Sequence, residues 1–332
     1  MKSPPKELRI PTLVSGGLIT NYYCTSACRH CLYGCSPRWE KKYIKKSSAT
    51  RMLQIIARMG CRSVHIGGGE PFLNPDGLED TLAAASETGI SIDYVETNSS
   101  WYQDHPKGIS LLKRLRRARL HTLLVSMSPF HNEHIPFYKV KGVLAACRDS
   151  GIAVFPWIDD FFPEIDSFDE RTPHPLSEYI AAFGSDYLDR IPSRYWIHFG
   201  GRALNTFSSS LPGYASEEIC SLNGDGCSEL NDTRHFHVDL FGNYIPGLCS
   251  GLAIQAEHLP GPLLQDEYPI LSLLYSEGIC GLYSMARQRF NFTSDDSYIS
   301  KCHLCLDIRR HMVIGCGVES LELQPVEFYN HV

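Results

Sequence analysis

The sequence of 332 residues contains no apolar run close to the roughly 18 residues that a membrane-spanning helix needs. Residues 1–11 are polar and rich in proline and lack the apolar stretch of a signal peptide, so we expect a cytoplasmic protein. Positive charge is not in excess, because 37 Asp and Glu outnumber 31 Lys and Arg and give a net charge of −6. The composition therefore gives no reason to expect a membrane or a nucleic acid as a partner.

Tandem repeats and low-complexity segments are absent as well, and 43% of the residues are apolar, which is enough for a folded core. The 13 cysteines are the unusual feature of the composition. An odd number of cysteines cannot pair completely as disulfides within one chain. In a cytosolic protein, closely spaced cysteines instead indicate metal binding or catalysis.

Strand-like and helical runs alternate along the first two thirds of the chain, with a repeat of about 30 residues that is typical of βαβ units. We expect six strands, near residues 18–23, 63–66, 91–95, 122–125, 152–155 and 195–199. Amphipathic helices between them, ended by Gly60, Gly89 and Gly151, predict an α/β fold with a parallel sheet. Six such units fit an open barrel as well as a flat sheet. The rhythm stops after Asn205, and we place a domain boundary near residue 210.

Three closely spaced cysteines, Cys24, Cys28 and Cys31, follow the first expected strand in the pattern C-x3-C-x2-C. Three thiolates on one loop can hold three corners of an iron–sulfur cubane, whereas such clusters normally take four cysteines. The fourth iron would then stay open for a ligand, at the sheet edge where α/β proteins place their chemistry. A zinc knuckle or three unrelated thiols are the alternatives. Cys35 lies outside the spacing and is interpreted as structural or incidental.

A glycine-rich loop that contains Gly68, Gly69 and Glu70 follows the second expected strand. Glycines let the backbone approach a ligand closely, and a carboxylate can accept hydrogen bonds from an ammonium group. Together the loop and the cysteine motif resemble those of the radical S-adenosylmethionine superfamily, although His30 stands where many members have another aromatic residue. The resemblance implies a 4Fe–4S cluster whose open iron binds S-adenosylmethionine, and a glycine-rich loop that contacts its amino group.

The same resemblance implies further contacts to S-adenosylmethionine at the ends of later strands. Asn98 follows the third strand, and Ser126 and Ser128 follow the fourth, where the family places groups that bind the ribose and the carboxylate. Many members have an acidic residue at the position of Ser128. Arg202 lies in a Gly-Arg-Ala stretch after the sixth strand, and it pairs either with a carboxylate ligand or within a structural ion pair.

A second set of cysteines lies near the C-terminus and consists of Cys227, Cys249, Cys302 and Cys305. A hairpin that joins the first two, together with the C-x2-C pair, supplies four thiolates, which is enough for a metal site. The spacing does not separate zinc from 4Fe–4S, and Cys220 is an alternative to Cys227. The pattern resembles the Twitch form of the Twitch/SPASM auxiliary domains, which implies a second 4Fe–4S cluster.

For the whole chain, the resemblance implies a partial (β/α)6 TIM barrel over residues 12–210 and a small α+β iron–sulfur domain over residues 211–332. It implies reductive cleavage of S-adenosylmethionine to a 5′-deoxyadenosyl radical, with flavodoxin or ferredoxin as electron donor. Because only 23 residues precede Cys24 and no cobalamin domain is present, we expect a small-molecule or short-peptide substrate in a biosynthetic pathway. A non-catalytic metal-binding or electron-transfer protein is the alternative, and Glu70 argues against it, since an electron carrier needs no contact to an amino group.

Polar residues at late strand ends are the candidates for contact with the substrate. Asp159 and Asp160 follow the fifth strand, where an acid pair flanked by aromatic residues can bind an amine or act as a base. The alternative is that these acids cap a turn. His131 follows the fourth strand, and His198 lies within the sixth.

Overall fold

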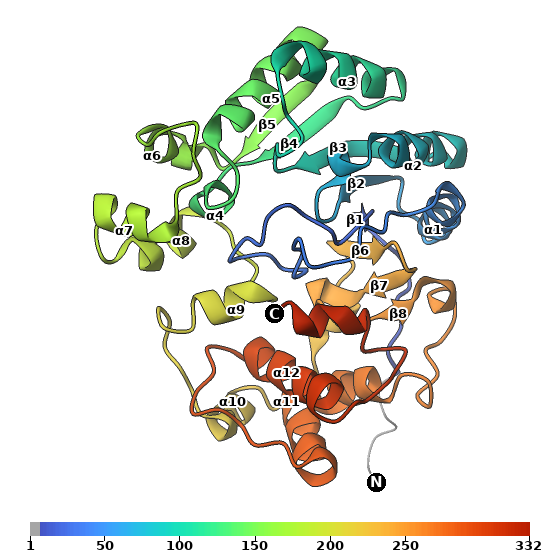
Figure 1. The fold of residues 1–332 in the computed structure, drawn as a ribbon. Helices are drawn as coiled ribbons and strands as arrows, with labels where there is room; N and C mark the ends of the chain where they lie inside the picture. Colours follow the sequence, from blue (N-terminus) through green and yellow to red (C-terminus); the bar gives the residue numbers. More distant parts are fainter. Residues whose placement is uncertain (1–6) are drawn as a thin grey trace. The chain divides into compact units, whose positions relative to one another are not determined.

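The computed structural model describes residues 7–332, except for the side chain of Trp157, and contains two compact units (Figure 1). The first, which we call the sheet unit, comprises residues 16–29 and 35–197. The second, which we call the C-terminal unit, comprises residues 7–15, 30–34 and 198–332. The units divide the chain after residue 197, and the domain boundary near residue 210 stays a prediction.

Five parallel strands form the core of the sheet unit, in the order β5-β4-β3-β2-β1. They are β1 (Gly16–Ile19), β2 (Ser63–Gly67), β3 (Ser91–Thr97), β4 (Thr122–Ser126) and β5 (Ala153–Trp157). Within the described residues these strands form an open sheet, as in a partial TIM barrel. The predicted α/β fold is confirmed, and the second to fifth strands lie where the sequence predicts them.

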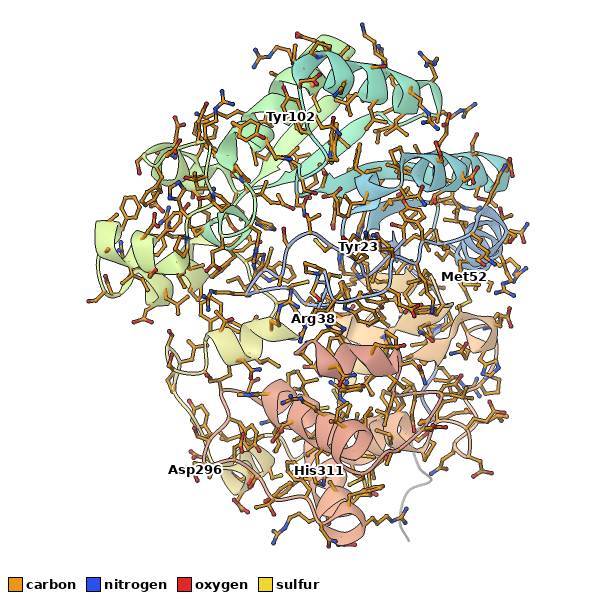
Figure 2. The ribbon with its side chains drawn as sticks, in the orientation of Figure 1. Tyr23, Arg38, Met52, Tyr102, Asp296 and His311 are labelled. Atoms are coloured by element: carbon orange, nitrogen blue, oxygen red, sulfur yellow. The ribbon has the colours of Figure 1, made fainter. Side chains whose placement is uncertain are left out.

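Helices connect these strands and pack against one another, α1 with α2 and α3 with α5 (Figure 1). The helices of the sheet unit are α1 (Lys46–Arg58), α2 (Pro75–Thr88), α3 (His105–Arg117), α4 (Pro129–Asn132), α5 (Phe137–Ser150), α6 (Phe162–Asp166), α7 (Leu176–Phe183) and α8 (Tyr187–Arg194). Tyr102, labelled in Figure 2, is buried between α3 and α5, where it contacts Gly108 and Gly142.

Helix α2 shows how the local sequence sets these boundaries. Pro75 begins the helix, where its missing N–H has no intrahelical partner to lose, and the Asn74 side chain accepts a backbone N–H at 3.0 Å. Gly89 ends the helix in the left-handed conformation. Leu78 and Leu82 lie one turn apart and are buried, and each such side chain contributes about 1.5–3 kcal/mol.

The sixth strand that the sequence predicts at residues 195–199 is absent from the described structure. Tyr195 and Ile197 are buried and Trp196 is 65% exposed, so burial alternates along this segment as it does in a strand. Alternating burial indicates an extended backbone, but a β-strand also needs a neighbouring strand for its hydrogen bonds. This segment follows α8 and pairs with no strand in the described structure. This part of the prediction is wrong.

The C-terminal unit combines a small antiparallel sheet with helices. Its elements are β6 (Phe236–Asp239), β7 (Asn243–Ile245), β8 (Ile254–Gln255), α9 (Arg202–Thr206), α10 (Ser216–Leu222), α11 (Pro269–Phe290) and α12 (Lys301–Arg310). β6 and β7 form the predicted hairpin, and the Asp239 carboxylate accepts the N–H groups of Phe241 and Asn243 in its turn. No helix within residues 7–332 has the length and apolar character needed to cross a membrane.

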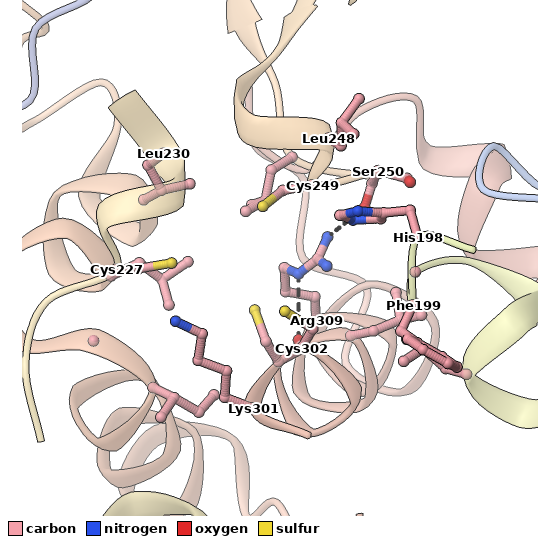
Figure 3. Close-up of a pocket in the computed structure, with 18 of the residues that line it drawn as sticks. His198, Phe199, Cys227, Leu230, Leu248, Cys249, Ser250, Lys301, Cys302 and Arg309 are labelled. Carbon is pink, nitrogen blue, oxygen red and sulfur yellow. Dashed lines mark hydrogen bonds between the residues drawn. The ribbon is translucent and has the colours of Figure 1, made fainter. Parts of the chain in front are cut away.

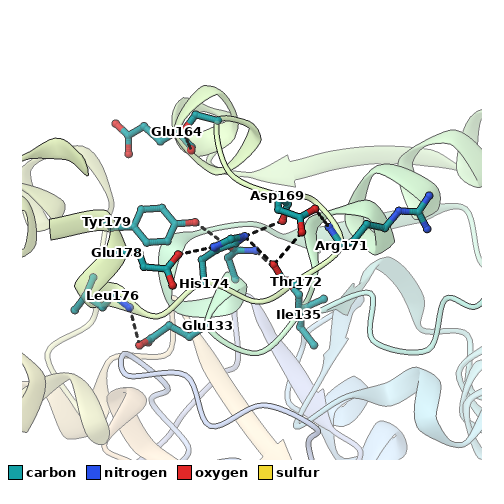
Figure 4. A network of polar contacts seen from close by, with 12 residues as sticks. Glu133, Ile135, Glu164, Asp169, Arg171, Thr172, His174, Leu176, Glu178 and Tyr179 are labelled. Atoms are coloured by element: carbon teal, nitrogen blue, oxygen red, sulfur yellow. Dashed lines mark hydrogen bonds and ion pairs between the residues drawn. The ribbon is translucent and has the colours of Figure 1, made fainter. Parts of the chain in front are cut away.

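A network of polar contacts fixes the segment that leads into α7 (Figure 4). His174 is 8% exposed, and its Nδ1 lies 2.7 Å from the Glu178 carboxylate while its Nε2 lies 2.7 Å from the Asp169 carbonyl oxygen. An imidazole donates to two acceptors only when it is protonated. Burial opposes this charge, but the hydrogen bonds to Asp169 and Glu178 outweigh burial and raise the pKa of His174.

We predict that His174→Ala lowers the free energy of unfolding by about 1–2 kcal/mol at pH 6, because two hydrogen bonds from a buried cation are lost. Since the pKa of His174 is raised in the folded state, its contribution is complete below pH 6.5 and is lost as the pH rises through the folded pKa. Urea denaturation at pH 6 and pH 9 measures this difference. His105→Ala, which removes a histidine 41% exposed in a surface pair with Asp149, is the control and should have little effect. An equal loss for His174→Ala at both pH values would contradict the charge assignment.

Candidate functional site

The loop after β1 places two of the three motif cysteines in the sheet unit. Cys24 and Cys28 are buried, and only 6% and 8% of their respective surfaces are exposed. The Cys24 sulfur accepts the backbone N–H of Ser26 at 3.4 Å and the side-chain amide of Asn98 at 3.3 Å. A sulfur that accepts two N–H donors is in the setting of a metal-bound thiolate, because such hydrogen bonds stabilise negative charge on sulfur.

Cys31 lies three residues further along the same loop, in the part of it that belongs to the C-terminal unit. Its carbonyl oxygen accepts the backbone N–H of Arg202 at 3.1 Å. Gly201 has a φ of 52°, and a Cβ there would come within 2.5 Å of the Cys31 oxygen, so only glycine fits. The Arg202 guanidinium donates to the carbonyl oxygen of His331 at 3.2 Å. The Gly-Arg-Ala stretch thus holds the backbone of the third motif cysteine.

The glycine-rich loop after β2 packs directly on the backbone that leads to Cys24. Gly69 donates its N–H to the Asn21 oxygen at 2.7 Å, and Glu70 donates its N–H to the Tyr23 oxygen at 3.1 Å. A Cβ on Gly69 would lie 2.0 Å from the Tyr23 oxygen, and one on Gly68 would lie 2.5 Å from the Asn21 oxygen. The glycines are therefore required for two backbones to approach each other at the start of the cysteine loop.

The Glu70 side chain turns into the protein and is completely buried. Its carboxylate accepts the backbone N–H of Phe72 at 3.1 Å, the Thr97 hydroxyl at 3.0 Å and the backbone N–H of Asn98 at 2.6 Å. Burial raises the pKa of the Glu70 carboxyl to about 7, although these hydrogen bonds lower it. Glu70 thus connects the ends of β2 and β3 and orients Asn98 toward Cys24. A direct contact from Glu70 to S-adenosylmethionine stays a prediction.

The polar residues after β4 form a local pair. The Ser128 hydroxyl lies 2.7 Å from Nδ1 of His131, and Ser126 is partly exposed at the end of β4. Burial, with a smaller effect of His134, lowers the pKa of His131 to about 4, so the imidazole is neutral at pH 7. The structure brings His131 and Ser128 together, and roles for these residues in binding or catalysis stay predictions.

Asp159 and Asp160 follow β5 in a short 3-10 turn and are both exposed. The residue before them, Ile158, has a φ of 66°, which is a strained conformation for a β-branched residue. The Arg194 guanidinium donates to the Asp160 carbonyl oxygen at 3.2 Å. Both acids thus stand at the carboxyl end of the sheet with their side chains open to a ligand.

The sequence interpretation missed a polar cluster on one face of the sheet. By register, His65 on β2 and Tyr94 and Glu96 on β3 share the face that also carries Phe155 on β5. His65 stacks on Tyr94 with ring centroids 5.0 Å apart, and His65 Nε2 lies 3.8 Å from Glu96. Parallel strands covered on both faces are apolar, so the polar residues Tyr94 and Glu96 within a strand are the signal that could have found this face.

The four C-terminal cysteines line a single pocket within the C-terminal unit (Figure 3). Cys227 comes from the loop that reaches α11, where its N–H donates to the Leu274 oxygen at 2.8 Å, and Cys249 follows β7. Cys302 and Cys305 lie one turn apart on α12. The remaining wall is mainly apolar and includes Leu204, Leu230, Leu248, Leu252, Leu274, Ile279 and Leu306. Burial raises the pKa of Cys227 to about 12 and of Cys302 to about 11.

The structure also distinguishes Cys227 from Cys220, between which the spacing does not choose. Cys220 lies on α10, and its carbonyl oxygen accepts the Cys280 thiol at 3.1 Å. Cys227 faces the pocket with the other three cysteines, whereas Cys220 is not among the pocket residues. His198, considered above as a substrate contact, lies in the wall of the same pocket, and burial lowers its pKa.

Residues 18–157 match the family model described as the Radical SAM superfamily. This range contains the three-cysteine motif, the glycine-rich loop, the end of β1 and all of β2 to β5. The matched segment, which is less than half of the chain, is similar to the Radical SAM superfamily. No curated protein matches the chain.

Solved structures with similarity to this chain include two proteins whose ligands are stated. The structure of native anSMEcpe with bound AdoMet is 12% identical at a TM-score of 0.45, and the match covers 91% of this chain and 97% of that one. The structure of Streptococcus suis SuiB bound to precursor peptide SuiA is 14% identical at a TM-score of 0.35, and the match covers 95% of this chain and 76% of that one.

We predict that Glu70→Gln removes a fall in the free energy of unfolding that wild type shows as the pH rises. Between pH 4.5 and about 7 the folded protein keeps the Glu70 proton while the unfolded chain releases it, so the wild-type free energy of unfolding falls as the pH rises. Glutamine does not titrate. The free energy of unfolding of wild type, relative to that of Glu70→Gln, should therefore fall by about 3 kcal/mol over this range and then level off. Urea denaturation of both proteins at pH 5, 6, 7 and 8 measures it. Parallel stability curves would show that Glu70 has an ordinary pKa.

Proposed function

We propose that the chain is a radical S-adenosylmethionine enzyme that acts on a small molecule or a short peptide. The observation that carries this proposal is the match of residues 18–157 to the superfamily model, with the cysteine motif and the glycine-rich loop inside that range. A reduced 4Fe–4S cluster supplies cleavage of S-adenosylmethionine to methionine and a 5′-deoxyadenosyl radical, which removes a hydrogen atom from the substrate. The alternative of a non-catalytic metal protein is an outcome of the tests below.

In this proposal Cys24, Cys28 and Cys31 hold the cluster. The chemistry of the donor set fits, because the Cys24 sulfur accepts two N–H donors that stabilise a thiolate. Gly68 and Gly69 let the glycine-rich loop pack on the backbone that leads to Cys24, and Glu70 keeps Asn98 in place beside Cys24. Gly68, Gly69 and Glu70 are the residues of this loop that we assign to the cofactor site. Ser126, Ser128 and Arg202 are the proposed groups for the remaining polar parts of S-adenosylmethionine.

We assign the four C-terminal cysteines to a second 4Fe–4S cluster of the Twitch/SPASM kind. What supports this assignment is that Cys227, Cys249, Cys302 and Cys305 line one pocket from three separate segments. Four partly buried thiols that line one pocket suit a thiolate-bound metal centre, and zinc is the competing occupant. The electron donor for the enzyme would be a low-potential protein such as flavodoxin or ferredoxin.

Metal and product analysis test the proposal together. The anaerobically reconstituted protein should hold about eight iron atoms, four for each cluster, and should form 5′-deoxyadenosine when it is reduced in the presence of S-adenosylmethionine. The combined change Cys24→Ala, Cys28→Ala and Cys31→Ala should leave about four iron atoms and abolish 5′-deoxyadenosine. Cys316→Ala, at an exposed cysteine outside both sets, is the control. Full iron in the triple variant, or no 5′-deoxyadenosine from loaded wild type, would refute the assignment.

Asp159 and Asp160 are the proposed substrate contacts, since they are exposed at the carboxyl end of β5. We predict that Asp159→Asn or Asp160→Asn lowers product formation at least tenfold while cleavage of S-adenosylmethionine continues, because only the substrate loses a partner. The ratio of product to 5′-deoxyadenosine measures this uncoupling. Asp149→Asn, at a surface acid paired with His105, is the control. Unchanged product in both variants, or an equal loss of cleavage and product, would remove these residues from the substrate site.

A further inference from the structure

Arg309 on α12 is a buried cation beside the four C-terminal cysteines. It is 4% exposed, and its guanidinium donates to the carbonyl oxygens of Ser250 at 2.9 Å and Cys305 at 3.2 Å, and to the Tyr329 hydroxyl at 3.1 Å. All of these acceptors are neutral. Within residues 7–332 no ion pair joins Arg309 to a carboxylate. A buried charge without a counter-charge is strongly unfavourable, so the structure calls for an anion near this side chain.

The second cation of the pocket is already balanced. Lys301 lies 2.8 Å from the Glu229 carboxylate, which also accepts the Cys227 thiol at 3.2 Å. Figure 3 shows Arg309 and Lys301 reaching toward the same group of sulfur atoms from α12. Asp225 also lines the pocket, but no ion pair joins it to Arg309 among the described residues. Arg309 is therefore the cation of this pocket that has no carboxylate within ion-pair distance.

A metal–tetrathiolate centre has the charge that this arrangement lacks. Four thiolates around a divalent ion, or around an oxidised 4Fe–4S core, leave a negatively charged centre. The same centre gains further negative charge when it accepts an electron. A fixed positive charge beside it stabilises the reduced form more than the oxidised form, and therefore raises the reduction potential.

We propose that Arg309 is the counter-charge of an anionic metal centre held by Cys227, Cys249, Cys302 and Cys305, and that it favours reduction of that centre. The inference rests on the proposed function, which places a second cluster at these cysteines. In this proposal Arg309 acts on the centre through its charge and through its hydrogen bond to the Cys305 carbonyl oxygen, so it is a positioning residue.

The test is the midpoint potential of this centre, measured by an EPR-monitored redox titration in the background of Cys24→Ala, Cys28→Ala and Cys31→Ala. Arg309→Gln keeps a hydrogen-bonding side chain and removes the charge, and it should lower the equilibrium constant for reduction at least tenfold, which is about 59 mV for one electron. Arg309→Lys keeps the charge and should stay within about twofold of wild type. Arg310→Gln, at the exposed neighbour on the same helix, should leave the potential unchanged.

An unchanged potential in fully loaded Arg309→Gln would overturn the proposal, as would a loss in Arg309→Lys equal to that in Arg309→Gln. If Arg309→Gln holds no metal while Arg309→Lys and Arg310→Gln are fully loaded, the counter-charge role is supported. Zinc in place of iron would refute the second iron–sulfur cluster but not the role of Arg309. In that case zinc release to a chelator should be at least tenfold faster in Arg309→Gln than in Arg310→Gln, and equal rates would overturn it. Wild-type protein that binds neither iron nor zinc at these cysteines would refute both the second cluster and the counter-charge role of Arg309.

Discussion

The buried carboxylate of Glu70 is the constraint on which the proposed cofactor site of the sheet unit depends. It accepts hydrogen bonds from the backbone after β2 and from Thr97 and Asn98 at the end of β3. Adjacent strand ends are therefore held at one spacing, and the Asn98 amide is held against the Cys24 sulfur at 3.3 Å. Glu70, a predicted cofactor ligand, thus also organises the edge of the sheet from which the proposed cofactor ligands extend.

Charge is the corresponding constraint in the C-terminal unit. Burial keeps the Cys227 and Cys302 thiols protonated at neutral pH, while Arg309 remains charged in the same apolar pocket. In the proposed metal centre the bound ion would replace the protons of the Cys227 and Cys302 thiols, and the site beside Arg309 would become anionic. The proposed metal ligands and the proposed counter-charge thus lie in one small group of side chains on α12 and the loops that face it.

Much of the fold follows from the sequence because the signals are local. Proline at the start of α2 and glycine at its end mark the helix without tertiary information. The prediction of a sixth strand was wrong for the opposite reason. Alternating burial at residues 195–197 is a local feature, but strand pairing depends on a neighbouring strand that the local sequence does not reveal. The limit is the same at Glu70, whose side chain accepts hydrogen bonds from Thr97, at the end of another strand, and from Asn98, just after it.

At the candidate sites, too, the sequence shows local features but not those that depend on tertiary contacts. Spacing indicates which cysteines form sets, but it does not decide between Cys220 and Cys227, because the choice depends on how the loop before Cys227 meets α11. Arg309 carries no signal at all in the sequence, since a helical arginine is usually exposed and only tertiary packing buries it. Strand register, likewise, is what brings His65, Tyr94 and Glu96 to one face.

The central claim is that three cysteines hold a 4Fe–4S cluster whose open iron binds S-adenosylmethionine. The most direct measurement is the EPR spectrum of the reduced protein with Cys249→Ala, Cys302→Ala and Cys305→Ala, in which only the first cluster remains. We predict a 4Fe–4S signal whose g values change when S-adenosylmethionine is added, because the ligand binds the cluster itself. A reduced protein without that signal, or a signal that S-adenosylmethionine leaves unchanged, would contradict the account.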